Sequence, residues 1–338
     1  MLQFRWLWPV LTVLLAFTCL LSISVGPVKI SLSHSLSAVV HWVSQVHLTD
    51  IAPHEQLVIN TVRLPRTLLA MTVGAILALS GAVMQGLFRN PLADPSIIGV
   101  SSGAALGAAL CIVLFPQAHA YWLPLGAFIG GLITTSAVYR LASRPSGTSV
   151  VLLLLSGVAI AALAGAGIGV LTYLANDIAL RDLSLWQMGS IAGAEWHYVG
   201  LTLIVLALLS WRFCGDSAAL NALLLGEAEA RHLGIDVDKL KFRLIALCAL
   251  GVGVSVAATG IIGFIGLVVP HLVRMLIGPD HRQLLPISAL LGAALLGLAD
   301  IGARAFLPPV EIPVGLVTAL LGAPFFIYLL LQQRSKLD

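Results

Sequence analysis

The sequence predicts an all-α polytopic membrane protein with about ten transmembrane helices. Charged residues make up 10% of its 338 residues, whereas a soluble domain carries about 25%, and its mean hydropathy is +1.01. Apolar runs of the roughly 20 residues needed to cross a bilayer recur along the chain. These runs are continuous rather than alternating, which favours helices over a β-barrel, because lipid-exposed backbone must satisfy its polar groups internally.

The first apolar run, residues 6–25, follows a single basic residue, Arg5. A secretory signal peptide also begins this way. This run is long, however, and no small-x-small cleavage site precedes a polar mature start. We therefore expect a retained first helix.

The predicted spans lie near residues 6–26, 62–86, 95–115, 121–140, 149–174, 195–213, 243–259, 262–277, 284–304 and 311–332. The eighth span is short and contains Pro270, which predicts a broken or half-length helix. Residues 176–194 include an apolar piece that is too short to cross the membrane. This piece either re-enters the membrane or lies against the protein.

Two of the spans share a pattern that suggests a weak internal two-fold repeat, as in many transporters. Small residues, which allow close helix contact in lipid, follow two arginines at the same four spacings. After Arg66 they are Gly74, Ala78, Gly81 and Gly86, and after Arg243 they are Gly251, Ser255, Ala258 and Gly263.

The distribution of Lys and Arg agrees with an even number of spans. Ten spans place both chain ends on one side of the membrane, and that side then receives thirteen of the 18 Lys and Arg residues. Cytoplasmic loops carry the Lys and Arg excess. Both termini are therefore expected in the cytoplasm.

The sequence contains no motif for catalysis. It has no GxxxxGK[ST] phosphate loop and no HExxH or GxSxG motif, so we expect neither an enzyme nor ATP hydrolysis by this chain. GAGIGV, residues 165–170, lies inside a predicted span, where glycines favour helix packing. The four cysteines lack metal-ligand spacing, so no metal site is expected, and a net charge of +3 gives no reason to expect nucleic-acid binding.

Charged residues inside the predicted spans are few. Asp300 and Arg304 are four apart on one helix and are expected to pair, and Glu311 begins the last span. Ion-driven carriers usually need a chain of buried acidic residues, and none is visible. The pattern favours a passive conduit whose energy comes from elsewhere.

One short stretch gathers charge between two apolar runs. GEAEARHLGIDVDKLKFR, residues 226–243, holds eight of the 33 charged residues in the largest predicted cytoplasmic loop. Helix formers followed by Gly234 predict a short helix that ends at a glycine. Such a helix suits docking of another protein, although a solvated loop is the alternative.

Four long stretches resemble the permease family that imports iron–siderophores, haem and cobalamin, the type II ABC importers. They are RLPRTLLAMTVGAILALSGAVMQGLFRNPLADPSIIGVSSGAALGA (63–108), LLLGEAEARHLGI (223–235), TGIIGFIGLVVPHLVRMLIGPDHRQLLP (259–286) and ADIGARAFLPPVEIPVGLVTALLGAPFFIYLLL (299–331). They occur in the family's order and cover the chain from about residue 60.

The resemblance implies a type II ABC importer permease fold, with residues 1–338 as one transmembrane permease domain in the bacterial cytoplasmic membrane. The family uses this subunit as a homodimer with two ATPase subunits and one periplasmic substrate-binding protein. ATP and magnesium would bind to the ATPase, and the permease would hold no cofactor of its own.

The resemblance also implies where these partners bind. The segment 215–241 would carry the coupling helices that sit in a cleft of the ATPase. Its matching residues are Gly226, Glu227, Glu229, Arg231, Leu233 and Gly234. At the outer face, Arg63, Arg66 and Arg304 would receive acidic residues of the binding protein, and the alternative is that they snorkel to the membrane interface.

Asn90 and Leu92, in RNPLADP, match the family's cytoplasmic gate, and a helix-capping turn is compatible with that role. The substrate is less constrained. Overall likeness favours haem over a ferric siderophore or cobalamin. His34, His41, His47 and His54 would allow an imidazole relay for haem iron, although exposed loop histidines are commoner. An ion-driven secondary carrier is the alternative from another class.

Overall fold

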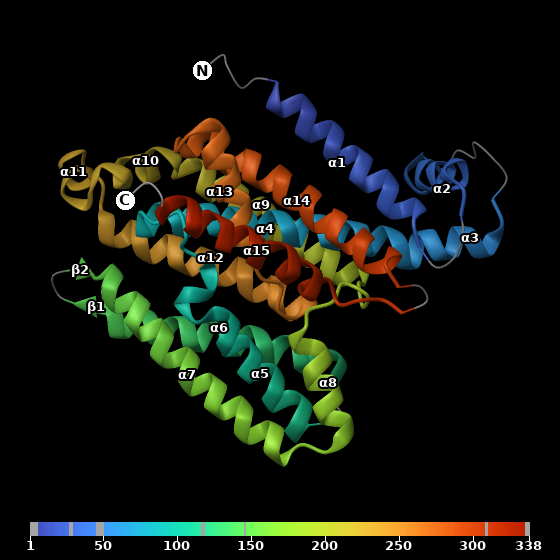
Figure 1. Cartoon of the computed structure of the whole chain (residues 1–338), viewed down its shortest axis with the longest axis horizontal. Coiled ribbons are helices and arrows are strands. Elements are labelled where there is room, and N and C mark those ends of the chain that lie inside the picture. The colour runs from blue at the N-terminus through green and yellow to red at the C-terminus, as the bar shows by residue number, and fades with distance from the viewer. Residues whose placement is uncertain are drawn as a thin grey trace.

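Figure 1 shows the computed structural model of the chain, which describes residues 6–26, 30–44, 51–115, 119–144, 147–307 and 310–334. The described residues are almost entirely helical. Their strands, β1 (Ser143–Arg144) and β2 (Gly147–Thr148), form one antiparallel hairpin. The helices in chain order are α1 (Leu7–Ser24), α2 (Leu32–Ser44), α3 (Pro53–Val58), the π-helical turn η1 (Ile59–Arg63), α4 (Leu64–Phe88), the 3-10 turn η2 (Pro95–Ile98), α5 (Val100–Leu114), α6 (His119–Ala142), α7 (Val150–Leu174), α8 (Asp177–Gln187), α9 (Trp196–Gly215), α10 (Ser217–Leu225), α11 (Glu227–His232), α12 (Val237–Thr259), α13 (Ile265–Ile277), α14 (His281–Ala305) and α15 (Val314–Arg334).

Within these described ranges, seven helical segments are long and apolar enough to cross a membrane. They are α1, the continuous rod from α3 to α4, α6, α7, α9, α12 and α14, and the apolar helices α5, α13 and α15 are shorter. Together they follow the order of the ten predicted spans. The prediction of an all-α polytopic membrane protein is confirmed.

Helix α4 lies at the centre of the molecule, with α9, α12, α13 and α14 packed around it (Figure 1). Within the rod from α3 to α4, 89% of the most apolar 18-residue stretch is buried. Glycines make this packing close: a methyl group on Gly74 would collide with the Gly292 carbonyl of α14, and one on Gly81 with the Gly266 carbonyl of α13. Small residues let helices approach closely where lipid offers no hydrophobic driving force.

Helix α13 is only 13 residues long. It follows a break in which Gly260 and Phe264 both have positive φ values, 69° and 68°. Pro270 lacks an N–H, so the carbonyl four residues earlier receives no helical hydrogen bond. That carbonyl belongs to Gly266 and lies against Gly81, while the Gln85 side chain donates to Leu267 O over 3.1 Å. The carbonyl that Pro270 leaves without a helical partner therefore faces protein, where irregular backbone at membrane depth is tolerated.

Helices α5, α6, α7 and α8 form a second group beside the α4-centred group (Figure 1). Gly107 of α5 and Gly126 of α6 lie so close that a methyl group on either would meet the other's carbonyl. Helix α7 covers the outside of this group, and only 17% of its most apolar 18-residue stretch is buried. Its exposed side chains are apolar, as a lipid or protein partner in the membrane requires.

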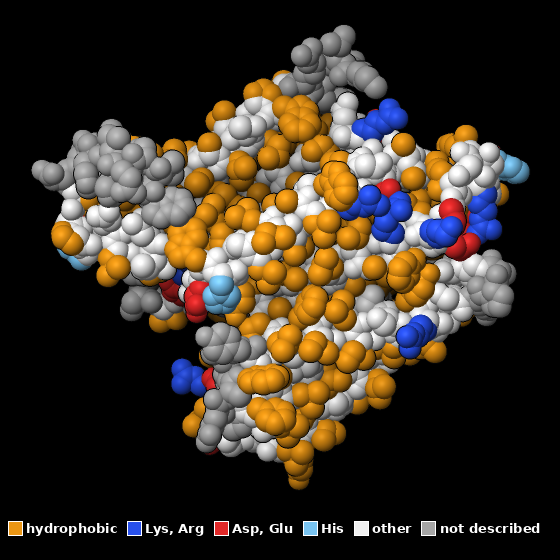
Figure 2. Space-filling view, turned by 180° about the vertical axis from the view of Figure 1, so that it is seen from behind, with side chains coloured by type: hydrophobic (Ala, Val, Ile, Leu, Met, Phe, Trp, Pro, Cys, Tyr) orange, Lys and Arg blue, Asp and Glu red, His pale blue; other side chains and the backbone are white. Residues whose placement is uncertain are grey.

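The surface reflects this layout. Figure 2 shows apolar side chains over the middle of one face, with charged side chains gathered mainly towards the ends. One end carries α10 and α11, and the other carries the start of the α3–α4 rod (Figure 1). The apolar belt between two charged ends is the pattern expected of a membrane-spanning protein.

Candidate functional sites

The stretch predicted to couple to an ATPase forms a compact projection at one end of the molecule. Helices α10 and α11 are separated by Gly226, whose φ of 123° suits glycine. Helix α11 stops at His232, and Gly234 follows with φ 82°, so the predicted glycine-terminated helix is confirmed. We refer to α10, α11, Leu233 and Gly234 as the coupling surface, after the role that the sequence predicts for this segment.

The coupling surface presents apolar side chains to its surroundings. Leu225 is 70% exposed and Leu233 is 64% exposed. Glu229 and Arg231 are also exposed, and Arg231 pairs with Asp238 of α12 over 3.0 Å. Exposed leucines surrounded by charge are typical of a protein-binding patch.

Glu227 has a different environment from its neighbours. Its Oε1 lies 2.6 Å from the Nζ of Lys241, whose side chain is 1% exposed. The same Nζ donates to the carbonyl of Thr148 over 2.8 Å. Glu227 therefore holds α11 against the protein instead of facing outward with Glu229 and Arg231.

The sequence pattern counted Lys241 among the charged residues of this stretch but did not predict its burial, although a signal was present. Residues Val237, Leu240, Leu244 and Ile245 mark the buried face of α12, and helical periodicity places Lys241 on that face. A lysine among buried apolar positions needs a partner, because an unpaired buried charge is costly. The partner, Glu227, comes from the neighbouring helix.

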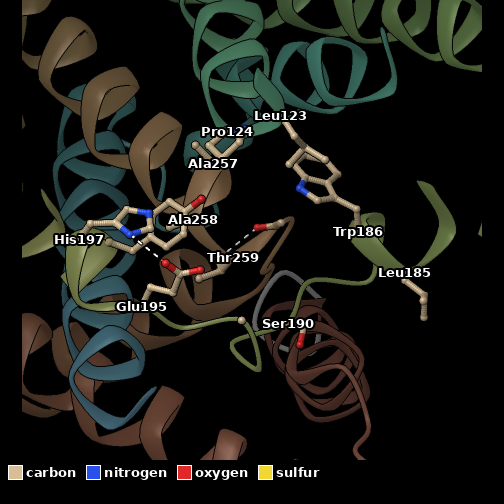
Figure 3. Close-up of a pocket in the computed structure, with 13 residues that line it drawn as sticks. Leu123, Pro124, Leu185, Trp186, Ser190, Glu195, His197, Ala257, Ala258 and Thr259 are labelled. Atoms are coloured by element: carbon tan, nitrogen blue, oxygen red, sulfur yellow. Dashed lines mark hydrogen bonds and ion pairs between the residues drawn. The ribbon is translucent and has the colours of Figure 1, made fainter. Parts of the chain in front are cut away.

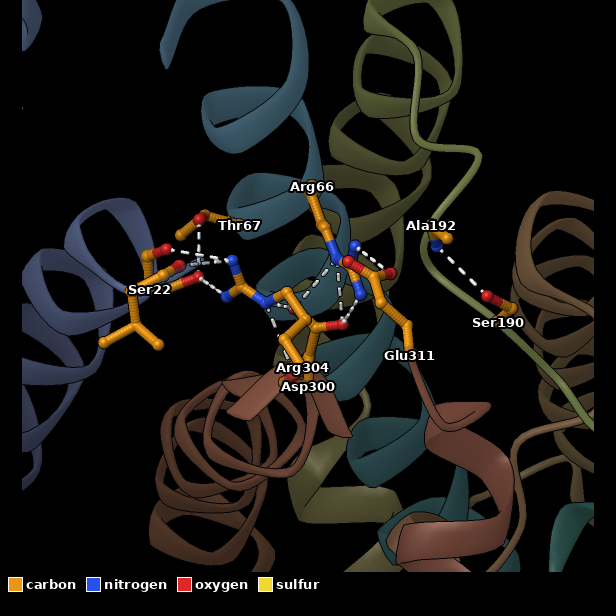
Figure 4. A network of polar contacts seen from close by, with 9 residues as sticks. Ser22, Arg66, Thr67, Ser190, Ala192, Asp300, Arg304 and Glu311 are labelled. Atoms are coloured by element: carbon orange, nitrogen blue, oxygen red, sulfur yellow. Dashed lines mark hydrogen bonds and ion pairs between the residues drawn. The ribbon is translucent and has the colours of Figure 1, made fainter. Parts of the chain in front are cut away.

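At the opposite end, which the sequence predicts to face outward, three arginines and two carboxylates lie close together, and we name Arg63, Arg66, Asp300, Arg304 and Glu311 the outer charge network. Figure 4 shows Arg66, Asp300, Arg304 and Glu311 of this network. The Nη2 of Arg66 lies 2.9 Å from Asp300 Oδ1, and its Nη1 lies 2.7 Å from Glu311 Oε2. The Nε of Arg304 lies 3.1 Å from Asp300 Oδ2. The predicted pairing of Asp300 with Arg304 is therefore confirmed.

The same network ties the first helix to the core. Arg63 Nη1 donates to the carbonyls of Ile23 and Ser24 over 2.6 and 2.9 Å. Arg304 Nη1 donates to the carbonyls of Ser22 and Val25 over 3.2 and 2.9 Å. The last carbonyls of a helix lack internal partners and carry partial negative charge. Two arginines thus cap the end of α1.

The three arginines are more buried than the sequence suggested. Arg63, Arg66 and Arg304 are 3%, 6% and 4% exposed, whereas a docking rim requires side chains that a partner can reach. The physical reason is the local supply of acceptors, since Asp300, Glu311 and the carbonyls of α1 satisfy the guanidinium groups inside the protein.

The candidate gate residues lie in the turn between α4 and η2. Arg89 ends α4 with φ 49°, and Asn90 Oδ1 accepts a hydrogen bond from Leu92 N over 2.9 Å. Asn90 is exposed and Leu92 is half-buried. The structure therefore has a helix-capping turn at this position. Such a turn is compatible with the gate that the resemblance implies.

The four loop histidines do not form one described site. His34 Nδ1 lies 2.7 Å from Glu55 Oε2, and His54 is exposed on α3. His41 lies on α2, but its side chain and the whole of His47 are outside the described residues. Among the described residues, no group of three His, Cys, Asp or Glu side chains is arranged to hold a metal ion.

A pocket of about 670 Å³ opens beside the ends of α8 and α12 (Figure 3). Its polar groups include Ser190, Glu195, His197 and Thr259, and Trp186 forms part of the wall. Glu195 Oε2 lies 3.2 Å from His197 Nδ1, and both side chains are more than half exposed. The sequence did not single out Glu195 or His197, because only the fold brings α6 and α12 beside the α8–α9 segment to form their pocket.

Comparison with known proteins decides the family. The model of the FecCD transport family matches residues 14–332. The chain belongs to this family. The hemin transport system permease protein HmuU of Yersinia pestis is 51% identical over 283 residues, covering 81% of this chain and 83% of that protein. The cobalamin import system permease protein BtuC of Halobacterium salinarum is 47% identical over 281 residues, covering 83% and 75%.

A solved structure agrees with the sequence relatives. A metal-chelate type ABC transporter in an inward-facing conformation superimposes with a TM-score of 0.85 at 37% identity, covering 97% of this chain and 99% of that chain. The predicted importer-permease fold is thereby confirmed. This member of the FecCD family is a permease subunit rather than an enzyme.

Proposed function

We propose that this permease carries haem across the bacterial cytoplasmic membrane into the cytoplasm, as part of an ATP-driven importer. The observation that carries the proposal is the 51% identity with a hemin transport permease over most of both chains. The superposition on a metal-chelate type transporter supports the same substrate class. Both chain ends then lie in the cytoplasm, on the side of the coupling surface.

The working assembly that we propose has a second copy of this chain, two ATPase subunits and one periplasmic binding protein. The ATPase would seat the coupling surface, where Leu225 and Leu233 are exposed. The binding protein would dock over the outer charge network, in which three arginines and two carboxylates leave one net positive charge. The buried arginines would act on an acidic partner through this net charge and not through direct contacts, because opposite charge steers association.

The substrate is tested by uptake into proteoliposomes that contain the assembled complex. Haem, a ferric siderophore and cobalamin are offered in parallel at equal concentration, each with its binding protein. ATP-dependent uptake of haem above the other two is expected. Uptake of cobalamin instead would favour the second candidate, a cobalamin permease. A cobalamin import permease is 47% identical to this chain.

The energy source is tested in the same vesicles. Transport should continue when the proton gradient is collapsed and ATP is supplied, because Asp300 and Glu311 are already engaged by Arg66. Uptake that depends on a proton or sodium gradient instead would support the secondary-carrier alternative and contradict the proposal.

The inner gate is tested by cross-linking. We propose that Asn90 and Leu92 approach their counterparts in the second copy at the cytoplasmic end of the pathway. With the native cysteines replaced, Leu92→Cys should cross-link to its twin when the gate is shut and less when ATP binding opens it. Equal cross-linking in both states would argue against a gate at this turn.

A further inference from the structure

The hairpin β1–β2 is held to the coupling surface by two side chains of α12. Lys241 Nζ donates to the Thr148 carbonyl over 2.8 Å, and Thr148 N donates to Asp238 Oδ1 over 3.3 Å. Both backbone polar groups of one residue are thus bound by one helix. We name Lys241, Asp238 and Thr148 the Thr148 clamp.

The same two side chains also hold α11. Lys241 pairs with Glu227 over 2.6 Å, and Asp238 pairs with Arg231 over 3.0 Å. Glu227 and Arg231 lie at opposite ends of α11. A shift of α11 therefore pulls on Lys241 and Asp238 at once.

The clamp acts on the start of α7. Thr148 is followed by Ser149, whose side chain caps α7 by accepting from Leu152 N. Helix α7 packs against α5, α6 and η2 and leaves most of its apolar face uncovered. The clamp is thus a short polar link between the coupling surface and a helix whose other neighbours belong mainly to the second group.

We propose that Lys241 is a positioning residue that transmits movement of the coupling surface to α7 through the Thr148 carbonyl. The burial of Lys241 makes this link rigid: its ammonium has fixed acceptors on two separate elements, and breaking a buried charge pair is costly. An exposed lysine could exchange its partners for water without moving either element. The inference rests on the proposed ATP-driven import, since it describes how work on α11 reaches the membrane helices.

The chain offers a matched control two residues away. Lys239 lies on the same helix but is 84% exposed and pairs only with Asp236, three residues earlier. Lys241→Met removes the ammonium with little change in side-chain length, and the freed Glu227 carboxylate, 34% exposed, can be hydrated. Lys239→Met makes the same chemical change without touching the clamp.

The test compares uptake with ATP hydrolysis in the full importer complex. For Lys241→Met, uptake per ATP hydrolysed should fall about tenfold, within the usual range for coupling between sites. Lys239→Met should keep the parent ratio. A purely structural role would lower the amount of active complex, and so would reduce uptake and hydrolysis together without changing their ratio. An unchanged ratio in Lys241→Met overturns the proposal.

Two milder variants keep the test decisive if Lys241→Met does not assemble. Glu227→Gln and Asp238→Asn each weaken one of the two ion pairs that join α11 to the clamp, at a partly exposed site, and both should lower the ratio. Parent-like ratios in both would overturn the inference. Should the parent complex itself fail to couple hydrolysis to uptake, the proposed function fails, which is a separate outcome from failure of the clamp.

A distance measurement gives a second readout. Spin labels at Leu233→Cys and Val151→Cys, in a background without native cysteines, report on the coupling surface and the start of α7. In the parent, ATP binding should leave the distance between the two labels nearly unchanged, because both segments move together, whereas in Lys241→Met this distance should change. An unchanged distance in the variant would contradict transmission through the clamp.

Discussion

The two charged ends of this permease use their arginines and lysines in opposite ways. At the end that we propose faces outward, Arg63, Arg66 and Arg304 are nearly inaccessible, and their partners are internal carboxylates and the carbonyls of α1. At the inner end, Arg231 stays exposed beside two exposed leucines, and Lys241 is the one buried lysine or arginine among the residues that the structure describes there. The outer charge network mainly holds α1 in place. The inner end offers a surface for a partner, with the buried Lys241 behind it.

The largest effect is expected at the outer end, from Asp300→Asn. Asp300 is fully buried and accepts from both Arg66 and Arg304, so its loss leaves two buried cations with one carboxylate between them. Breaking a buried ion pair typically costs about 3–5 kcal/mol, and the free energy of unfolding should fall accordingly. The Tm of the detergent-solubilised protein measures this change.

Glu311→Gln serves as the matched variant, because its side chain is 28% exposed and pairs with Arg66 alone. Its drop in Tm should be clearly smaller than that of Asp300→Asn. Equal Tm values for Asp300→Asn and the parent would show that the network does not stabilise the fold.

The next effect is expected at the inner end. Leu233→Asp places a charge in the centre of the apolar part of the coupling surface, and capture of the ATPase subunit should weaken by about tenfold, as for a central interface residue. Phe306→Asp is the comparison at the other end, where the side chain is 80% exposed. Affinity for the ATPase, measured by biolayer interferometry, should be unchanged in Phe306→Asp. Equal losses of affinity in Leu233→Asp and Phe306→Asp would mean that the two ends do not differ in ATPase binding.

Helical periodicity and charge predicted much of this molecule. The ten apolar runs, the short helix ending before Gly234 and the Asp300–Arg304 pair all follow from spacing within one segment. The partners of Arg66 could not be found in this way. They lie 234 and 245 residues away in sequence, and only the packing of α14 beside α4 brings Asp300 and the segment after α14 close to Arg66.

The same limit applies at the inner end. The sequence pattern identified a charged helix but not which of its charges faces inward. Glu227 and Glu229 are two apart on α11, so they point in different directions, and only the position of α12 decides that Glu227 meets Lys241. The pocket at Glu195 and His197 was missed for the same reason, because its walls come from α6, α8, α9 and α12.

A subtler difference between the ends should appear in binding-protein docking. Glu311→Gln removes one of the two carboxylates of the outer charge network and raises its net positive charge by one. Docking of an acidic binding protein should then tighten severalfold at low salt and depend more steeply on salt, because surface charge is screened over about 8 Å at physiological ionic strength. Glu229→Gln, at the inner end, should leave docking unaltered. A binding curve for Glu311→Gln that coincides with the parent at every salt concentration would mean that the network does not attract the binding protein.

The smallest effect is expected from the exposed pair beside the Thr148 clamp. The pKa of Asp236 is lowered chiefly by its side-chain hydrogen bond with Lys239, helped by the backbone N–H of that residue. Lys239→Ala removes the first of these contacts and keeps the second, in which Lys239 N donates to Asp236 Oδ1 and caps α12. The pKa of Asp236, followed by carbon-13 NMR of labelled protein, should therefore rise towards its ordinary value. Because an exposed pair exchanges its contacts for water at little cost, Tm and coupling should stay at the parent level. A loss of coupling as large as that expected for Lys241→Met would show that burial does not separate these two lysines, and the contrast between exposed and buried charge at the inner end would fail.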